Sequence, residues 1–249
     1  MSVTGHGELS GCAAIVTGAS RNIGRAIAVT LASGGASVLL HANGARSEVE
    51  TTARLVQEAG GKAAVAIGDL TDPTVPARLV DEALAAFGRL DFIVANAGTR
   101  PESPLGEMSY EEWRHVMALT LDSVFLLIKA GLPALRRSER AAIVMLGGLS
   151  AHSGGSHRAH VIAAKAGIAG LARALATEFG EEGITVNCVA PGLIDTQRAD
   201  VVPHTKRTNA LKRKGRPEDI AAMVRLLCGP DGRYITGQTL HVNGGALMV

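Results

Sequence analysis

The stretch Thr17-Gly18-Ala19-Ser20-Arg21-Asn22-Ile23-Gly24 follows a short apolar run and precedes a helical pattern at 25–33. A strand, a tight glycine turn and a helix in this order form a cradle for phosphate groups. Gly18 permits the sharp turn, and Gly24 lets the helix approach the strand closely. Asn22 stands where a middle glycine is expected, and because asparagine tolerates positive φ we expect the turn to keep its shape. Free N–H groups at the helix start can then face a pyrophosphate, so the stretch predicts a dinucleotide site.

Strand-like apolar runs alternate with helical patterns along the whole chain. The runs lie at 13–16, 37–40, 63–67, 92–95, 141–146, 185–189 and 239–242, and the helical patterns at 25–33, 46–59, 73–87, 109–137, 160–180 and 217–228. This alternation indicates βαβ crossovers, hence an α/β fold with a doubly wound, Rossmann-type parallel sheet that has helices on both faces. No shift in composition marks a second domain, so residues 1–249 are interpreted as one dinucleotide-binding domain.

One segment, 195–216, interrupts this alternation. It contains few apolar residues, and its cations include Lys206, Arg207, Lys212, Arg213 and Lys214. Long loops in compact domains are often lids or mobile segments. We interpret the segment as a solvated, flexible face or lid, with a clamp for an anionic substrate as the alternative.

Composition excludes several classes of function. The chain is 47% hydrophobic with 3% aromatic residues, which favours an aliphatic, alanine-rich core. Its net charge of +2 argues neither for nor against nucleic acid, and because no basic face dominates we expect no nucleic-acid partner. The three cysteines, Cys12, Cys188 and Cys228, share no metal-ligand spacing, and we expect buried, reduced thiols and no metal. No apolar leader and no membrane-spanning run is evident, so we expect a soluble, cytoplasmic protein that binds no membrane.

The end of the second predicted strand bears on the choice of cofactor. An NAD site needs a carboxylate there for the ribose hydroxyls, but Ala42 and Asn43 supply none and Glu48 lies within the next helix. Arg21 and Arg46 are close enough in sequence to reach a 2′-phosphate. This combination favours NADP(H) over NAD(H).

Two further strand ends carry candidate polar groups. Asp69, followed by Leu70, could accept a hydrogen bond from an adenine amino group or cap the helix near Pro73. Asn96-Ala97-Gly98 closes the fourth strand at the carboxyl edge, where open α/β sheets bind ligands; an ordinary turn is the alternative.

Almost the whole chain resembles the short-chain dehydrogenase/reductase family. The resemblance is carried by 17–24, Asp69-Leu70, 96–98, 163–167 (Ala-Ala-Lys-Ala-Gly), 186–192, 216–219 and 235–245, in the family's order and spacing. Within the family it is most similar to β-ketoacyl carrier-protein reductases. The resemblance implies a seven-stranded parallel sheet, a bound nicotinamide dinucleotide and commonly a homotetramer, with 109–137 and the helix at 161–179 at a subunit interface.

The family's chemistry uses a tyrosine and a lysine four residues apart on one helix face, a preceding serine and an upstream asparagine. The ammonium favours the phenolate, so that tyrosine can exchange a proton with the substrate oxygen. Here Lys165 is present, but the tyrosine position falls on Val161, the serine position on Gly148 and the asparagine position on Thr120. No tyrosine lies between 143 and 165, and the chain's tyrosines, Tyr110 and Tyr234, are both remote in the family pattern.

Histidines crowd the stretch before Val161. His152 and His160 are candidates for a replacement acid because imidazole titrates near neutral pH. On a helix, His160 points about 100° away from Val161, so it reaches the site only if the helix begins after it. The resemblance places His152 and Arg158 at the substrate pocket, where a polar rim is the alternative to catalysis.

The motif and the resemblance together assign the site residues. The catalytic candidates are Lys165, His160 and His152. The resemblance puts the Ile194 backbone at the carboxamide and Thr196 near the pyrophosphate. Cofactor binding is assigned to Thr17, Gly18, Ser20, Arg21, Asn22, Ile23, Gly24, Asn43, Asp69, Leu70, Asn96, Ala97, Gly98, Lys165, Pro191, Gly192, Ile194 and Thr196.

Three functions remain open at this stage. The first is an NADP(H)-dependent oxidoreductase with a non-standard active site and a small-molecule substrate. The second is a catalytically silent cofactor-binding subunit, a partner of an active paralogue. The third is a non-redox enzyme that uses the same pocket. The fold cannot choose between them, because function depends on the site.

Overall fold

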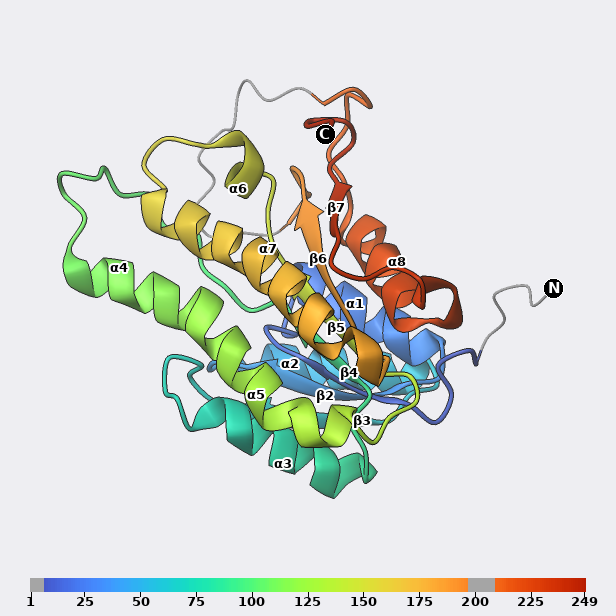
Figure 1. Ribbon diagram of the computed structural model, residues 1–249. Helices are drawn as coiled ribbons and strands as arrows, with labels where there is room; N and C mark the ends of the chain where they lie inside the picture. Colours follow the sequence, from blue (N-terminus) through green and yellow to red (C-terminus); the bar gives the residue numbers. More distant parts are fainter. Residues whose placement is uncertain (1–6, 197–208) are drawn as a thin grey trace.

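The computed structural model describes residues 7–196 and 209–249, which fold around one parallel sheet of seven strands in the order β3-β2-β1-β4-β5-β6-β7 (Figure 1). The strands are β1 (Ala13–Val16), β2 (Ser37–Ala42), β3 (Ala63–Ile67), β4 (Phe92–Ala95), β5 (Ala142–Leu146), β6 (Thr185–Pro191) and β7 (Thr239–Val242). The helices are α1 (Asn22–Ser33), α2 (Arg46–Glu58), α3 (Val75–Phe87), α4 (Tyr110–Met117), α5 (Ser123–Leu135), α6 (Ser150–Ser153), α7 (Ala159–Phe179) and α8 (Pro217–Cys228). The predicted doubly wound fold is confirmed.

Helices cover both faces of the sheet because successive strand residues point to opposite sides. Ala14 and Val16 of β1 belong to the core beneath α1 and α8, whereas Ile15 belongs to the core beneath α3, α5 and α7. Figure 1 shows α3, α5 and α7 side by side in front of the sheet. Since both faces are buried there, the central strands β1, β4 and β5 consist of continuous apolar runs rather than alternating ones.

Two helices are long and apolar enough to cross a membrane, Tyr110–Leu135 and Ala159–Glu182. Both contribute to the apolar core beneath α3, α5 and α7. They are core helices of a soluble fold, and Cys12, Cys188 and Cys228 are likewise buried, as free thiols.

The single helix expected at 109–137 is interrupted. A π-helical turn at Ala118–Asp122 separates α4 from α5, and Thr120 lies within it. Directly after this turn, the Ser123 hydroxyl at the start of α5 donates to the Leu119 carbonyl at 2.7 Å. No motif in the sequence marks this widened turn, and such turns are frequent at functional sites.

The chain order reverses between β1 and β4, which are neighbours although β2 and β3 lie between them in sequence. Crossovers on either side of this point diverge and leave a crevice at the carboxyl ends of the strands. The glycine turn after β1 and Asn96 after β4 both lie at this edge.

Candidate functional site

The glycine turn has the geometry that the sequence predicted. Gly18 has φ +65° and Asn22 has φ +51°. A Cβ on Gly24 would lie 2.1 Å from the Gly18 carbonyl oxygen, so only glycine fits. The Asn96 amide nitrogen donates to the carbonyls of Thr17 (2.9 Å) and Gly18 (3.0 Å), which fixes the turn against β4.

Thr17 acts behind the turn rather than in a cavity. Its hydroxyl accepts from the backbone N–H groups of Asn96 and Ala97, both at 3.0 Å, and the residue is buried. These bonds tie the end of β1 to the end of β4. Thr17 therefore shapes the site without lining either of the cavities there.

A groove of about 830 Å³ runs along the turn. Its lining includes most of the residues assigned to the cofactor: Gly18, Ser20, Arg21, Asn22, Ile23, Gly24, Asn43, Leu70, Asn96, Ala97, Gly98 and Thr196. A backbone turn that only glycine can complete, beside the N-terminus of α1, fits the phosphates of a dinucleotide.

His41, which the sequence reasoning missed, supports the floor of this groove. Its Nδ1 accepts from the Gly18 N–H at 3.4 Å, and its Nε2 lies 2.9 Å from the Gly68 carbonyl. Burial lowers the pKa of His41, which favours the neutral ring that this pattern requires. The hydrophobic run of β2 gave no signal for this role, because the contacts come from distant parts of the chain.

Three charged residues around the groove differ from the sequence expectations. Arg46 does not line it and lies 3.6 Å from Glu50 on the exposed face of α2. Asp69 does not line it either: its carboxylate accepts from the Thr71 N–H and hydroxyl, both at 2.9 Å, which lowers the pKa of Asp69. Glu48 does line the groove, and its Oε2 is buried without a hydrogen-bond partner among the described residues.

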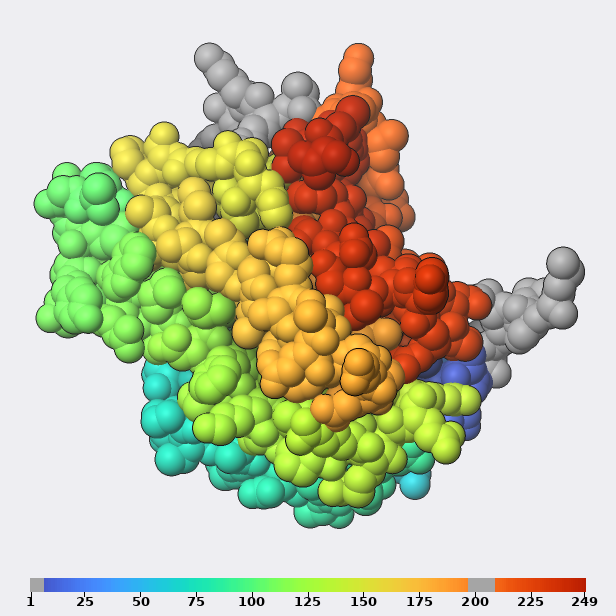
Figure 2. Space-filling view, in the orientation of Figure 1, coloured from blue at the N-terminus to red at the C-terminus, as the bar shows by residue number. Residues whose placement is uncertain are grey.

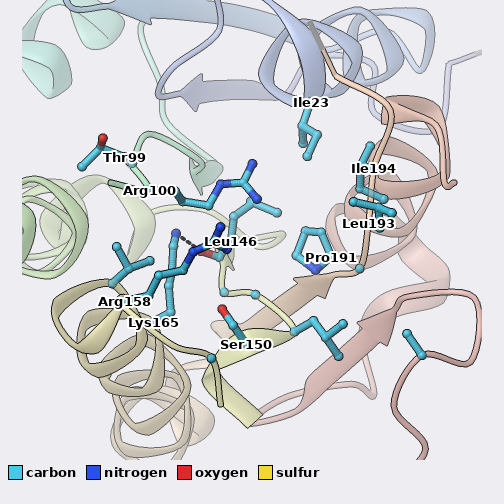
Figure 3. A pocket seen from close by; sticks show the side chains of 18 of the residues that line it. Ile23, Thr99, Arg100, Leu146, Ser150, Arg158, Lys165, Pro191, Leu193 and Ile194 are labelled. Carbon is cyan, nitrogen blue, oxygen red and sulfur yellow. Dashed lines mark hydrogen bonds between the residues drawn. The ribbon is translucent and has the colours of Figure 1, made fainter. Parts of the chain in front are cut away.

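A second cavity of about 450 Å³ adjoins the groove (Figure 3). Lys165, Val161, Gly148, Ser150 and Pro191 line it, together with Gly192 and Ile194. A Cβ on Gly148 would meet no atom within 4 Å, so the pocket has room at that position.

Lys165 is the buried cation of this pocket. Its Nζ donates to the Leu146 carbonyl at 2.5 Å, and burial lowers the pKa of Lys165 to about 8. A Cβ on Gly98 would lie 3.5 Å from this Nζ and 3.7 Å from Thr120 Oγ1, which is buried and without a partner in the described chain. The ammonium therefore lies close to the mouth of the groove along the glycine turn, where Gly98 lines both cavities.

The structure brings neither candidate histidine to the pocket. Because α7 already begins at Ala159, His160 points to α4, where its Nε2 lies 3.3 Å from Glu112 Oε1, and it is fully buried. His152 lies with its ring 4.6 Å from that of His241, centroid to centroid. Neither histidine lines the cavity, whereas His157 does.

The basic segment at 195–216 is described only in part. Lys206 and Arg207 lie outside the described residues. Of the others, Arg213 pairs with Asp219 at 3.0 Å and Lys214 with Asp195 at 3.3 Å. Because these two cations have carboxylate partners within the chain, the structure does not support a clamp built from them.

Arg100 and Arg158 line both cavities. Arg158 precedes α7, and Arg100 lies in the loop after β4 (Figure 3). The sequence reasoning placed Arg158 at the pocket but passed over Arg100, for which only its position two residues after Gly98 could have served as a signal.

The fold and the glycine turn define a doubly wound protein of the Rossmann type. Residues 18–246 match the family model described as enoyl-(acyl carrier protein) reductase. The chain is 39% identical to the 3-oxoacyl-[acyl-carrier-protein] reductase FabG of Escherichia coli K12, over 97% of this chain and 100% of that protein. It is also 39% identical to the short-chain dehydrogenase/reductase FrzI of Cladobotryum, over 95% and 96% of the two chains.

Two solved structures of dehydrogenases are also similar to this chain over nearly its whole length. A dehydrogenase/reductase from Sinorhizobium meliloti is 34% identical with a TM-score of 0.92, covering 98% of each chain. A short-chain dehydrogenase from Burkholderia cenocepacia in complex with NADP is 32% identical with a TM-score of 0.90, covering 96% of this chain and 99% of that one. The chain belongs to the short-chain dehydrogenase/reductase family, an oxidoreductase family.

Proposed function

We propose that the protein is an NADP(H)-dependent oxidoreductase that interconverts a carbonyl and an alcohol with a non-standard active site. The observation that carries the proposal is the position of Lys165, a buried ammonium in a pocket that shares Asn96 and Gly98 with the nucleotide groove. In this interpretation Gly148, Val161 and Thr120 replace the serine, tyrosine and asparagine of the family.

The groove residues fit the cofactor. The turn from Gly18 to Gly24 would hold the pyrophosphate, and Lys165 with the Ile194 backbone would hold the nicotinamide ribose and carboxamide. When bound, the cofactor supplies or accepts the hydride. Arg21, which lines the groove, and the NADP complex of the B. cenocepacia relative support NADP(H).

NAD(H) is the second candidate cofactor, and one observation favours it. The unpartnered Oε2 of Glu48 in the groove could accept a hydrogen bond from a ribose hydroxyl, as the carboxylate of NAD sites does. Isothermal titration with NADPH and NADH distinguishes the two. The proposal requires the tighter binding of NADPH.

The proton must come from a group other than a tyrosine. Val161 carries no exchangeable proton, whereas Lys165, with a pKa of about 8, is mostly protonated at neutral pH and lines the pocket. We propose that the Lys165 ammonium supplies the proton to the substrate oxygen, directly or through water, and that the Ser150 hydroxyl helps to orient that oxygen. A lowered lysine pKa brings proton exchange into the working range of pH.

Deuterium transfer tests the function. Incubation of the protein with 4-deuterated NADPH and a panel of ketones is expected to place the label on the product carbon, and the amount transferred is measured by mass spectrometry. A background level of transfer with every ketone, together with tight NADPH binding, would favour the silent subunit of an active paralogue. Activity that is independent of added cofactor would favour the non-redox enzyme.

A gain-of-function variant tests the site assignment. Gly148→Ser with Val161→Tyr restores the family's two hydroxyl groups, and the open space at Gly148 accommodates the serine. Because general acid catalysis contributes roughly 10²–10⁴-fold, we expect reductase activity to rise by at least tenfold. Gly148→Ser alone is the matched control, since it adds a hydroxyl without a general acid.

We also propose a cytoplasmic homotetramer. A mainly apolar hollow on the outer face of α5 and α7 supports the oligomer, and its lining is Leu121, Asp122, Phe125, Leu126, Gly167, Gly170, Leu171 and Ala174. Figure 2 shows both helices on the exposed front face, and Phe125 is 49% exposed. Light scattering of the purified protein measures the oligomeric state.

A further inference from the structure

The pocket beside the nucleotide groove has an excess of positive charge. Arg100, Arg158 and Lys165 line it, and Glu102 is the one carboxylate among its described lining residues. Figure 3 shows the nitrogen-bearing ends of the three cationic side chains directed into the same part of the pocket. The mechanism proposed above uses Lys165 but neither arginine.

Arg158 is positioned by the protein rather than left to solvent. Its side chain is 21% exposed, and one guanidinium nitrogen donates to the Glu102 carboxylate. The other N–H groups of this guanidinium have no acceptor in the part of the chain that the structure describes. A guanidinium presents several donors in a rigid fork, so one edge can bind Glu102 while another remains available for a ligand.

Arg100 is the second available cation. It lies two residues after Gly98, which itself lies beside Lys165, and within 7–196 and 209–249 it makes no hydrogen bond or ion pair. In a partly enclosed pocket, water screens the attraction between an anion and the two arginines less than it does at an open surface. The attraction is therefore stronger than at an exposed site.

From this arrangement we propose that Arg158 and Arg100 bind an anionic group of the substrate, so that the enzyme acts on small oxo acids or oxo phosphates rather than on neutral ketones. The inference rests on the proposed oxidoreductase function, because the anion would hold the carbonyl carbon between the arginines and Lys165. Carboxylate and phosphate share the geometry that a guanidinium fork recognises.

The competing use of these residues is cofactor binding, since both arginines also line the groove. A simple surface ion pair between Arg158 and Glu102 is the other alternative, and such pairs contribute little to stability. The test therefore has to separate substrate binding, cofactor binding and folding.

Acetoacetate and methyl acetoacetate are matched probes, because they share a carbon skeleton and differ in charge. We expect kcat/KM with NADPH to be at least about tenfold higher for acetoacetate than for methyl acetoacetate, because one charge-assisted contact contributes about that much. Titration calorimetry of both probes into the protein without cofactor gives a readout that is independent of turnover. Acetonyl phosphate replaces acetoacetate in a third set of titrations. The anion that binds more tightly shows whether the site prefers a carboxylate or a phosphate.

Substitutions assign the effect to residues. Arg158→Gln is expected to abolish the preference for acetoacetate, and Arg158→Lys to restore part of it. Glu102→Gln breaks the same ion pair but keeps the cation, so acetoacetate binding is expected to persist. Arg54→Gln, on an exposed side chain of α2, is the control for the loss of one positive charge.

Three results would overturn the inference. The first is equal binding of acetoacetate and its methyl ester by the wild-type protein. The second is a loss of NADPH affinity in Arg158→Gln as large as the loss of acetoacetate affinity, which would assign the arginine to the cofactor. The third is a loss of acetoacetate affinity in Glu102→Gln as large as that in Arg158→Gln, which would assign the Arg158–Glu102 ion pair a structural role. Failure of NADPH to bind at all would instead refute the proposed function, while the calorimetry without cofactor still decides the anion site.

Discussion

The substitution Lys165→Met tests whether the buried ammonium lowers stability. Burial lowers the pKa of Lys165 from 10.5 to about 8. A fall in pKa of that size corresponds to roughly 3 kcal/mol of differential interaction between the charged and neutral forms. Because the folded-state pKa lies below the unfolded value, the unfolded chain binds more protons between pH 8 and 10.5, so this group makes stability rise with pH in that window.

Urea unfolding at several pH values between 7 and 10.5 measures the effect as the free energy of unfolding. The wild-type protein is expected to gain roughly 3 kcal/mol relative to Lys165→Met across this range, with most of the gain above pH 8. Lys62→Met, which removes an exposed lysine, is the control and should not reproduce the difference. A constant difference between wild type and Lys165→Met at all pH values would refute the argument that burial perturbs this lysine.

Three further predictions concern the turn, the choice of cofactor and the opposite end of the sheet. Gly24→Ala places a Cβ 2.1 Å from the Gly18 carbonyl oxygen, so we expect it to lower the free energy of unfolding by about 1–3 kcal/mol and to abolish NADPH binding. Urea unfolding and calorimetry measure the two effects, and Gly180→Ala, with open space around it, should show neither. Arg21→Ala is expected to weaken NADPH about tenfold while leaving NADH unchanged, and an equal loss for both would remove Arg21 from the 2′-phosphate. Asp91→Ala removes a fully buried carboxylate that accepts from the Ala13 N–H at 2.8 Å and pairs with Arg89. We expect the free energy of unfolding, measured by thermal unfolding, to fall by about 3 kcal/mol, and a fall below about 1 kcal/mol would contradict this.

The sequence predicted the sheet and the glycine turn because both depend on local rules. Apolar runs of strand length that alternate with helical periodicity leave few topologies open, and the observed sheet is doubly wound and parallel, as expected. The turn is equally local: Gly24 is required because its Cβ would strike the Gly18 carbonyl, six residues away in sequence. Asn22 takes the positive φ that its side chain tolerates.

Contacts between distant segments decided the rest of the site. His160 faces Glu112 of α4, 48 residues away, because α7 begins one residue before it, and helix ends are poorly marked in sequence. Arg46 pairs with Glu50, and the Asp69 carboxylate accepts from the Thr71 N–H, so neither side chain lines the groove. Glu48, which the sequence placed in the helix after the second strand, does line it. The sequence by itself determined where the glycine turn lies and what shape it takes, since sterics act over a few residues. Only the tertiary structure decided which charged side chains face the pocket, because burial and charge depend on what the fold brings alongside.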